Sequence, residues 1–354
     1  MLMAMQKSIL TLASNKGDSK MADNIFTPTT EMNQILRDSG SAQKEVAMAA
    51  TAELAKALEL PLRKGLLSGD ILGGIFEPIA LEAGASPEFP LDFISPGSEK
   101  DFVAYTIPNH GRIPERHVEG DYVIVPTYDV GASIDYMLKY ARDARWDVVG
   151  RAMEVMEAQF TKKMNDDGWH TILSAGVDRN IIVFDSDAGA GQFSKRLVSL
   201  MKTVMRRNGG GNSSSLNRGS MTDLYVSPEA MEDIRNWGVD QVDETTRREI
   251  YVANDGAINR VFGVNLQDLD ELGEQQEYQK FYENELAASV ASGDKELVVG
   301  LDQSTNDAFV MPVRQDVQIF EDDQLHRQKR AGFYGWAEIG FGVLDNRRVL
   351  LGSL

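Results

Sequence analysis

A glycine-rich turn that could bind phosphate lies between an expected strand, Asn180–Phe184, and an expected helix, Phe193–Arg207. Its sequence is DSDAGAGQFSK, and backbone N–H groups at such a helix start favour anions. A Walker loop needs Gly-Lys-Ser/Thr at the helix start, whereas here Gly191 is followed by Gln-Phe and then Ser194-Lys195 in reversed order. We therefore expect an ordinary strand-to-helix turn, capped by Ser or Gly.

Two groups of carboxylates could in principle bind a hard cation through oxygen ligands. They are Asp185 with Asp187, and the run Glu321-Asp322-Asp323. Neither group has the further acidic positions and the distal Glu of a calcium loop. We therefore expect solvated, charged turns at both places.

The histidines do not form a recognisable site either. His110, His117, His170 and His326 lack the H-E-x-x-H spacing of zinc enzymes, and the chain has no G-x-S-x-G elbow. The chain contains no cysteine, which excludes disulfides and thiolate chemistry. We predict no catalytic residues, no cofactor and no metal site, and hence a protein that is not an enzyme.

The bulk composition indicates a globular protein with an acidic surface. The chain has 354 residues, 42% of them hydrophobic, and a formal net charge of −18. This length suits one large or two medium domains, and no apolar run is long enough to span a membrane. The negative surface repels polyphosphate, so we expect no sequence-specific binding of DNA. Residues 1–30 are polar and Met-rich, and we expect them to be a disordered leader.

A long extended stretch, residues 84–131, precedes the other expected elements of the chain. Proline and glycine punctuate two strand-length pieces in it, Asp101–Ile107 and Asp121–Thr127. An isolated two-stranded arm is only marginally stable in water. We therefore predict that this arm lies on a neighbouring copy of the chain.

A long amphipathic helix is expected to follow the arm. Apolar residues recur at three- and four-residue spacing from Ile134 to Phe160. Ser133 is the expected N-cap, and residues 165–168 are the expected stop. A helix over Ser133–Met164 would be about 48 Å long, far above the usual length.

The remainder has an α+β pattern followed by a block of strands. Between Val177 and Ser304 short strands and helices alternate, and Ser227 before Pro228 indicates the start of a helix. The last block, Asp307–Leu354, alternates clearly in Phe333, Gly335, Ala337, Ile339, Phe341 and Val343. These closing strands need partners, and we expect the apolar face of the long helix upstream to be one.

This order of elements resembles that of the major capsid proteins of tailed bacteriophages with the Hong Kong 97-type fold, from about Lys44 onward. The resemblance rests on architecture and on segments such as TDLYVSPEAMEDIRNW and RAGFYGWAEIGFGVLDNRRVLLGSL. It implies an α+β fold with a peripheral and an axial domain. The implied segments are an N-terminal arm and linker (31–83), an extended β-hairpin loop (84–131), a spine helix (132–176), an axial domain (177–304), and closing strands of the peripheral domain (305–354) whose last strand returns to the axial domain.

The resemblance also implies a function and partners. Copies of the chain would form the hexamers and pentamers of an icosahedral head shell that encloses DNA in the virion and assembles in the host cytoplasm. Scaffolding, portal and decoration proteins are the expected partners. The leader is too short to be a fused scaffolding segment of about a hundred residues. Because Lys100 has no recognisable Asn and Glu partner pattern, we predict no covalent cross-links.

Charged residues in two regions are the candidate assembly contacts. They are Lys100, His110, Arg112, Arg116 and Glu119 in the extended loop, and Arg327, Arg330 and Arg347 near the end. In a symmetric assembly the latter would meet acidic patches such as residues 321–323 on neighbours. Two alternatives remain: an encapsulin-like compartment shell, and an α+β enzyme that uses Asp185, Asp187 or the glycine-rich turn on a phosphorylated substrate.

Overall fold

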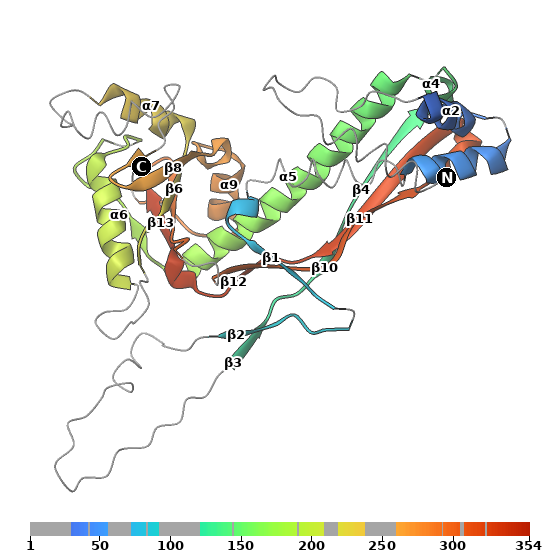
Figure 1. Cartoon of the computed structure of the whole chain (residues 1–354). Helices are drawn as coiled ribbons and strands as arrows, with labels where there is room; N and C mark the ends of the chain where they lie inside the picture. Colours follow the sequence, from blue (N-terminus) through green and yellow to red (C-terminus); the bar gives the residue numbers. More distant parts are fainter. Residues whose placement is uncertain are drawn as a thin grey trace, which may run out of the picture. The chain divides into compact units, whose positions relative to one another are not determined.

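The computed structural model describes residues 30–41, 43–55, 72–82, 84–91, 121–143, 145–189, 191–208, 219–237, 260–291, 293–304, 308–322 and 324–354. The chain divides into two compact units. The smaller unit contains residues 1–57, 134–154 and 321–333, and the larger contains 58–133, 155–320 and 334–354. Strands β4 (Tyr128–Met137) and β11 (Arg330–Ile339) and helix α5 (Trp146–Asp178) continue from one unit into the other. Figure 1 labels these elements.

The smaller unit is built from short helices and strand ends. Its helices are α2 (Thr30–Ser39), residues 44–55, α4 (Leu138–Arg142) and the short turn η6 (Leu325–Gln328). Its core contains Leu36, Leu54 and Ala141, all at most 2% exposed. The rings of Tyr136 and Phe333 lie 6.0 Å apart and join strand β4 to β11 within this core.

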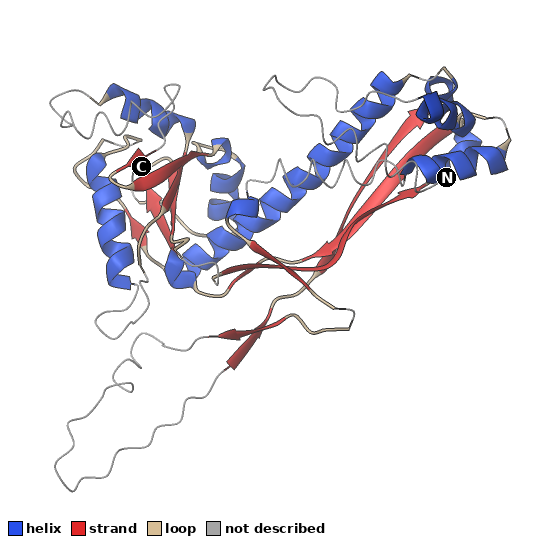
Figure 2. Cartoon of the chain, viewed as in Figure 1, coloured by secondary structure: helices blue, strands red, loops and turns tan. Residues whose placement is uncertain are grey.

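The larger unit contains most of a first sheet, in the order β1-β10-β11-β4, with β12 paired to β10. The strands not yet defined are β1 (Glu77–Ala80), β10 (Phe309–Glu321) and β12 (Gly342–Val343). Strand β1 runs parallel to β10, with Glu77 opposite Val310, and the turn η1 (Leu72–Gly74) precedes it. Figure 2 shows these strands and the helices. On one face, Met156 and Phe160 of α5 meet β11 at Gly335, which confirms the prediction that the long helix packs against the closing strands.

The second sheet of the larger unit has the order β5-β13-β9-β6-β8-β7. Its strands are β5 (Ile182–Val183), β6 (Asp223–Val226), β7 (Arg260–Val261), β8 (Val264–Asp268), β9 (Leu297–Leu301) and β13 (Val349–Ser353). Strand β13 is antiparallel to β9 and parallel to β5, and the short turn η7 (Asn346–Arg348) precedes it. The last strand therefore lies in the sheet formed by the strands of residues 182–301.

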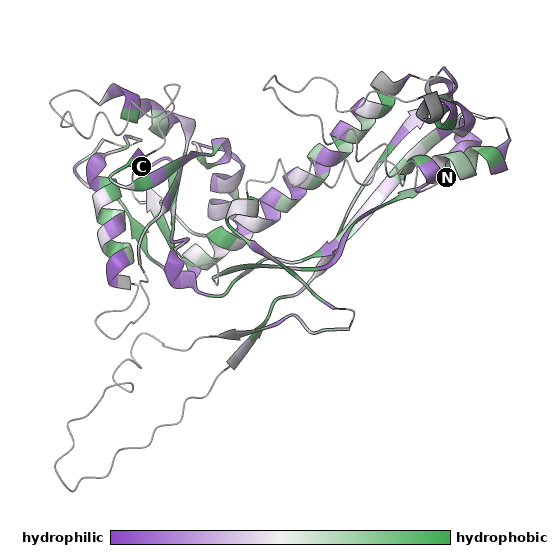
Figure 3. Ribbon diagram, in the orientation of Figure 1, coloured by the Kyte–Doolittle hydropathy of each residue, from purple (hydrophilic) through white to green (hydrophobic). Residues whose placement is uncertain are grey.

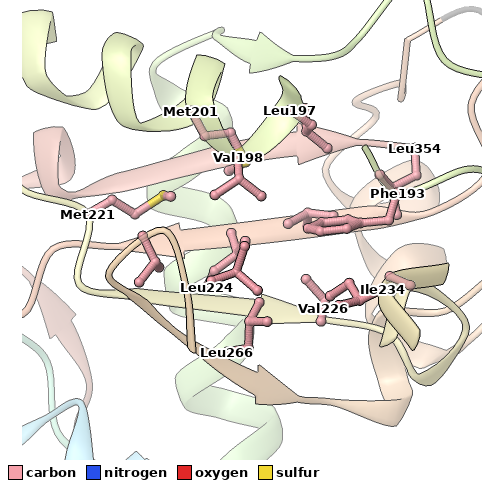
Figure 4. Close-up of a cluster of buried hydrophobic side chains, with 14 of the residues drawn as sticks. Phe193, Leu197, Val198, Met201, Met221, Leu224, Val226, Ile234, Leu266 and Leu354 are labelled. Carbon is pink, nitrogen blue, oxygen red and sulfur yellow. The ribbon is translucent and has the colours of Figure 1, made fainter. Parts of the chain in front are cut away.

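One face of the second sheet is covered by α6 (Lys195–Asn208) and α7 (Pro228–Asn236). Figure 4 shows Leu197, Val198 and Met201 of α6 over Leu224 and Val226 of β6. Ser227 caps α7, because its Oγ accepts a hydrogen bond from the N–H of Ala230 at 3.1 Å, and this confirms the predicted helix start.

The other face of the second sheet packs against the C-terminal half of α5. Because side chains alternate along β6, Tyr225 points away from Leu224 and Val226 and meets Trp169 of α5. Three short elements lie beside α5 on this side: η4 (Asp270–Leu272), α9 (Glu277–Lys280) and the π-helical turn η5 (Phe281–Glu285). Tyr278 of α9 stacks on Trp169 with ring centroids 6.0 Å apart.

Both predicted ends of the long helix are wrong. Residues 133–137 belong to strand β4, and the long helix begins only at Trp146, after α4. At the other end the helix continues through residues 165–168 to Asp178. Gly168 lies inside the helix. Its lack of a side chain leaves room for Leu72, whose side chain would overlap a Cβ placed there.

Candidate assembly surfaces

Three aromatic side chains form an exposed patch on the first sheet, which we call the aromatic patch: Phe320 of β10 with Tyr334 and Trp336 of β11. Tyr334 is 43% and Trp336 40% exposed. Their rings lie 5.5 Å and 6.3 Å, respectively, from that of Phe320. Exposed aromatic clusters of this kind mark protein interfaces, where aromatic residues are enriched.

The pleat of β11 explains why the aromatic patch faces outward. Phe333, Gly335 and Ala337 are buried, whereas Tyr334 and Trp336 between them are exposed. The sequence contains the signal for this patch, because the alternation that marks one face of β11 as core also marks the other as open.

A two-stranded ribbon forms the base of the extended loop. Strands β2 (Glu88–Leu91) and β3 (Asp121–Ile124) are antiparallel, with Phe89 opposite Val123. Phe89 and Val125 pack on Val310 of β10, which ties the ribbon to the first sheet. On the outward side, Tyr122 is 64% and Ile124 61% exposed.

Several loop residues named in the sequence analysis lie outside the described residues. These are Lys100, His110, Arg112, Arg116 and Glu119, together with the expected strand Asp101–Ile107. Their role as assembly contacts stays a prediction.

The three arginines near the end of the chain have different surroundings. Arg330 forms an exposed ion pair with Asp135 at 2.8 Å, and Arg327 is exposed. Arg347 instead pairs at 2.8 Å with Asp345, and its side chain is only 14% exposed. Much of the charge of Arg347 is therefore used within the chain, and its role in assembly stays a prediction, like those of Arg327 and Arg330.

The turn before α6 is a capped turn surrounded by carboxylates. Ser194 Oγ accepts from the N–H of Leu197 at 3.0 Å and donates to Asp185 at 2.6 Å. The N–H of Phe193 donates to Asp233 at 2.8 Å. This confirms the predicted cap, and the two carboxylates disfavour a bound phosphate at this helix start.

Arg196 neutralises the acidic pair that could have bound a cation. Its guanidinium lies 3.4 Å from Asp185 and also contacts Asp187. In the second acidic run, Asp322 accepts from the N–H of Gln324 at 3.0 Å. Among the described residues, no group of three His, Asp or Glu side chains could hold a metal ion.

Two ionisable groups with shifted pKa values, His170 and Asp166, lie where α5 packs against α9 and η5. The ring of His170 stacks on Phe281 at 3.7 Å, and burial lowers the pKa of its imidazole. Asp166 accepts from the hydroxyl of Tyr278 at 3.1 Å, and burial raises the pKa of this carboxyl, with a smaller contribution from Glu277. These groups hold α5 to its neighbours.

Within the described ranges no helix is long and apolar enough to cross a membrane.

Comparisons with known proteins give structural matches but no sequence matches. No protein-family model and no curated protein matches the chain. A chain of Microbacterium phage Oxtober96 is similar over 81% of this chain and 90% of its own, with a TM-score of 0.53 and 9% identity. The capsid of an empty GTA particle matches over 81% and 90%, with a TM-score of 0.53 and 11% identity. The capsid of cyanophage Pam1 matches over 79% and 88%, with a TM-score of 0.51 and 12% identity. The chain therefore has the Hong Kong 97-type fold of tailed-phage capsid proteins.

Proposed function

We propose that the chain is the major capsid protein of a tailed bacteriophage, the structural subunit of the icosahedral head shell that encloses the DNA genome. The observation that carries this proposal is the aromatic patch on a chain with a capsid fold. Phe320, Tyr334 and Trp336 offer a surface suited to another protein, and the opposite face of β11 is already packed by α5.

The physical basis of assembly is many modest contacts for each subunit. A standard interface buries about 1,600 Å² in total, and a subunit in a closed shell has several of them. Because each new contact is made by a subunit already held by others, modest pairwise affinity is enough to close a shell. The net charge of −18 suits a shell that encloses DNA without binding it tightly.

The finer parts of the proposal follow from the resemblance of the sequence to this family. Copies would be arranged as hexamers and pentamers, and scaffolding, portal and decoration proteins would be the partners. The subunit would be found in the virion after assembly in the host cytoplasm. The absence of an enzymatic activity belongs to the same proposal.

The test is electron microscopy of the expressed chain, alone and together with the products of its neighbouring genes. We expect closed particles, which sedimentation should also detect. Single subunits at high concentration under both conditions would contradict the proposal. Nuclease-protected DNA in particles purified from infected cells would favour a phage head, and a packaged enzyme without DNA would favour a compartment shell.

A further inference from the structure

Helix α6 has a cationic outer face on an otherwise acidic chain. Its sequence KRLVSLMKTVMRRN contains five cations and no acidic residue. Its apolar face, which includes Met201 and Met205, is buried in the core of the second sheet. Arg206 and Arg207 in the last turn are exposed. Figure 3 shows hydrophilic and hydrophobic residues alternating along this helix.

A hollow adjoins the outer face of α6. Its volume is about 370 Å³, and it is lined by Lys202, Thr203, Arg206, Arg207, Gly219, Ser220 and Met221. Lys202 Nζ donates to the carbonyl of Phe262 at 2.6 Å, so its charge is held at this place. We call Lys202, Arg206 and Arg207 the basic surface.

A second surface has the opposite charge. The stretch from Asp270 to Glu285 contains six acidic residues and one lysine. Its exposed carboxylates are Asp270, Glu274, Glu277, Glu283 and Glu285, which we call the acidic surface. Glu277 lies 3.3 Å from Lys162 and Glu274 lies 3.6 Å from Lys295, and both pairs are solvent-exposed. Even when these two lysines and the exposed Lys280 are counted, the five carboxylates leave this surface with a net negative charge.

The second sheet separates the two charged surfaces. Helix α6 covers the face to which Leu224 and Val226 point, whereas α9 lies with Trp169 and Tyr225 on the other face. A contact that joins them between two copies uses different patches on each copy. Contacts of this head-to-tail kind generate rings when the rotation between copies closes.

We propose that the basic surface of one copy docks against the acidic surface of a second copy of this chain, in a head-to-tail contact. This inference rests on the proposed shell function, because such a contact serves to arrange copies in a ring. The charges set the register of neighbouring copies and speed their encounter more than they add affinity. Screening acts over about 8 Å at physiological salt, so the contact weakens as salt is added.

Cross-linking tests the contact directly, since the chain contains no cysteine and gives no background. One variant carries Thr203→Cys on α6, and another carries Gln276→Cys beside α9; both positions are exposed. After mild oxidation, we expect the mixture to give a disulfide-linked dimer of the two variants, with a yield that falls as salt is raised. The control pairs Thr203→Cys with Ser86→Cys, an exposed position on neither surface. Equal yields in the two mixtures would overturn the inference, even if the chain forms no shells.

Charge reversal tests whether the contact guides assembly. We expect Arg206→Glu with Arg207→Glu, or Asp270→Lys with Glu285→Lys, to slow assembly at least tenfold at low salt while leaving the melting temperature nearly unchanged. A variant with all four changes should assemble again. If wild type and both reversed variants form shells equally fast, the docking inference fails while the shell function stands. If the fourfold variant stays as slow as the others, the inference fails as well.

Discussion

Trp169 of α5 meets Tyr225 of β6 edge-on, with ring centroids 4.8 Å apart. Trp169 is fully buried, and it also stacks on Tyr278 of α9. One indole therefore joins the long helix to the second sheet and to the short helix beside it. Aromatic pairs in this geometry contribute about 0.5–1.5 kcal/mol each beyond the area they bury.

Replacing Trp169 by alanine should destabilise the folded chain by about 3–5 kcal/mol, the usual cost of a large cavity. Urea unfolding followed by circular dichroism measures this change. The matched control is Trp336→Ala, because this indole is 40% exposed and its removal should cost about 1 kcal/mol or less. Equal losses for the two variants would show that Trp169 does not join these elements.

The aromatic patch should matter for assembly and little for folding. We expect Tyr334→Ser with Trp336→Ser to leave the melting temperature nearly unchanged and to lower the yield of particles at least tenfold, because aromatic side chains supply much of the energy of an interface. Sedimentation velocity measures the fraction assembled. Phe184→Ser is the control, since Phe184 is 48% exposed and lies outside the patch. A similar defect in the control would argue against a specific role.

Stability should fall in mildly acidic solution because of His170. Burial lowers the pKa of this imidazole from its ordinary value of 6.5, so the folded chain binds the proton less tightly than the unfolded chain does. The stabilisation is complete above pH 6.5 and is lost as the pH falls through the lowered pKa. His170→Phe keeps a ring on Phe281 without a titrating group, and it should flatten this part of the pH profile.

Urea midpoints at several pH values above about 5 measure this effect, because carboxylates titrate mostly below that pH. Burial raises the pKa of Asp166, and its protonation therefore acts in the opposite direction at lower pH. Parallel profiles for wild type and His170→Phe would contradict the assignment to this side chain.

Gly219 should tolerate no side chain. Its φ is +84°, and a Cβ there would lie 2.5 Å from the carbonyl oxygen of Met205. The same residue donates its N–H to the fully buried Asp302 at 2.8 Å, so the backbone has little freedom to move away. Gly263 also has a positive φ, +75°, but no atom within 4 Å of the Cβ position.

This pair of glycines separates a steric clash from backbone strain. Gly263→Ala should cost about 1–2 kcal/mol through its φ alone. Gly219→Ala should cost clearly more, because both strain and the clash apply. Thermal unfolding of the two variants measures the difference, and an equal cost would show that the chain relaxes around residue 219.

The sequence predicted best where a local signal and the tertiary structure agree. Ser227 before Pro228 is such a place, because the cap and the fixed proline φ both favour a helix start. The alternation of β11 from Phe333 onward also matches the structure. The boundaries of the domains named in the sequence analysis stay a prediction.

The sequence misled where one pattern fits two structures. Ile134, Met137, Leu138 and Ala141 recur at helical spacing, yet Ile134 and Tyr136 also alternate as in a strand, and pairing with β11 decides for the strand. Gly168 was expected to lie at a helix end. The structure instead explains the glycine by the packing of Leu72, which is distant in the sequence and fills the space of a side chain at this position. The sequence analysis did not predict helix α2. It did not predict the aromatic patch either, because the patch depends on the pairing of β10 with β11.

Strand β13 lies between β5 and β9, although the chain reaches it only after all the other strands of that sheet. During synthesis, β9 and β6 can pair while residues 349–353 are still missing, and the free edge of β9 is then open to the wrong partner. Pairing that depends on such distant segments is slow. Polypeptides that end before residue 349 would therefore leave this strand edge exposed and would be prone to aggregate.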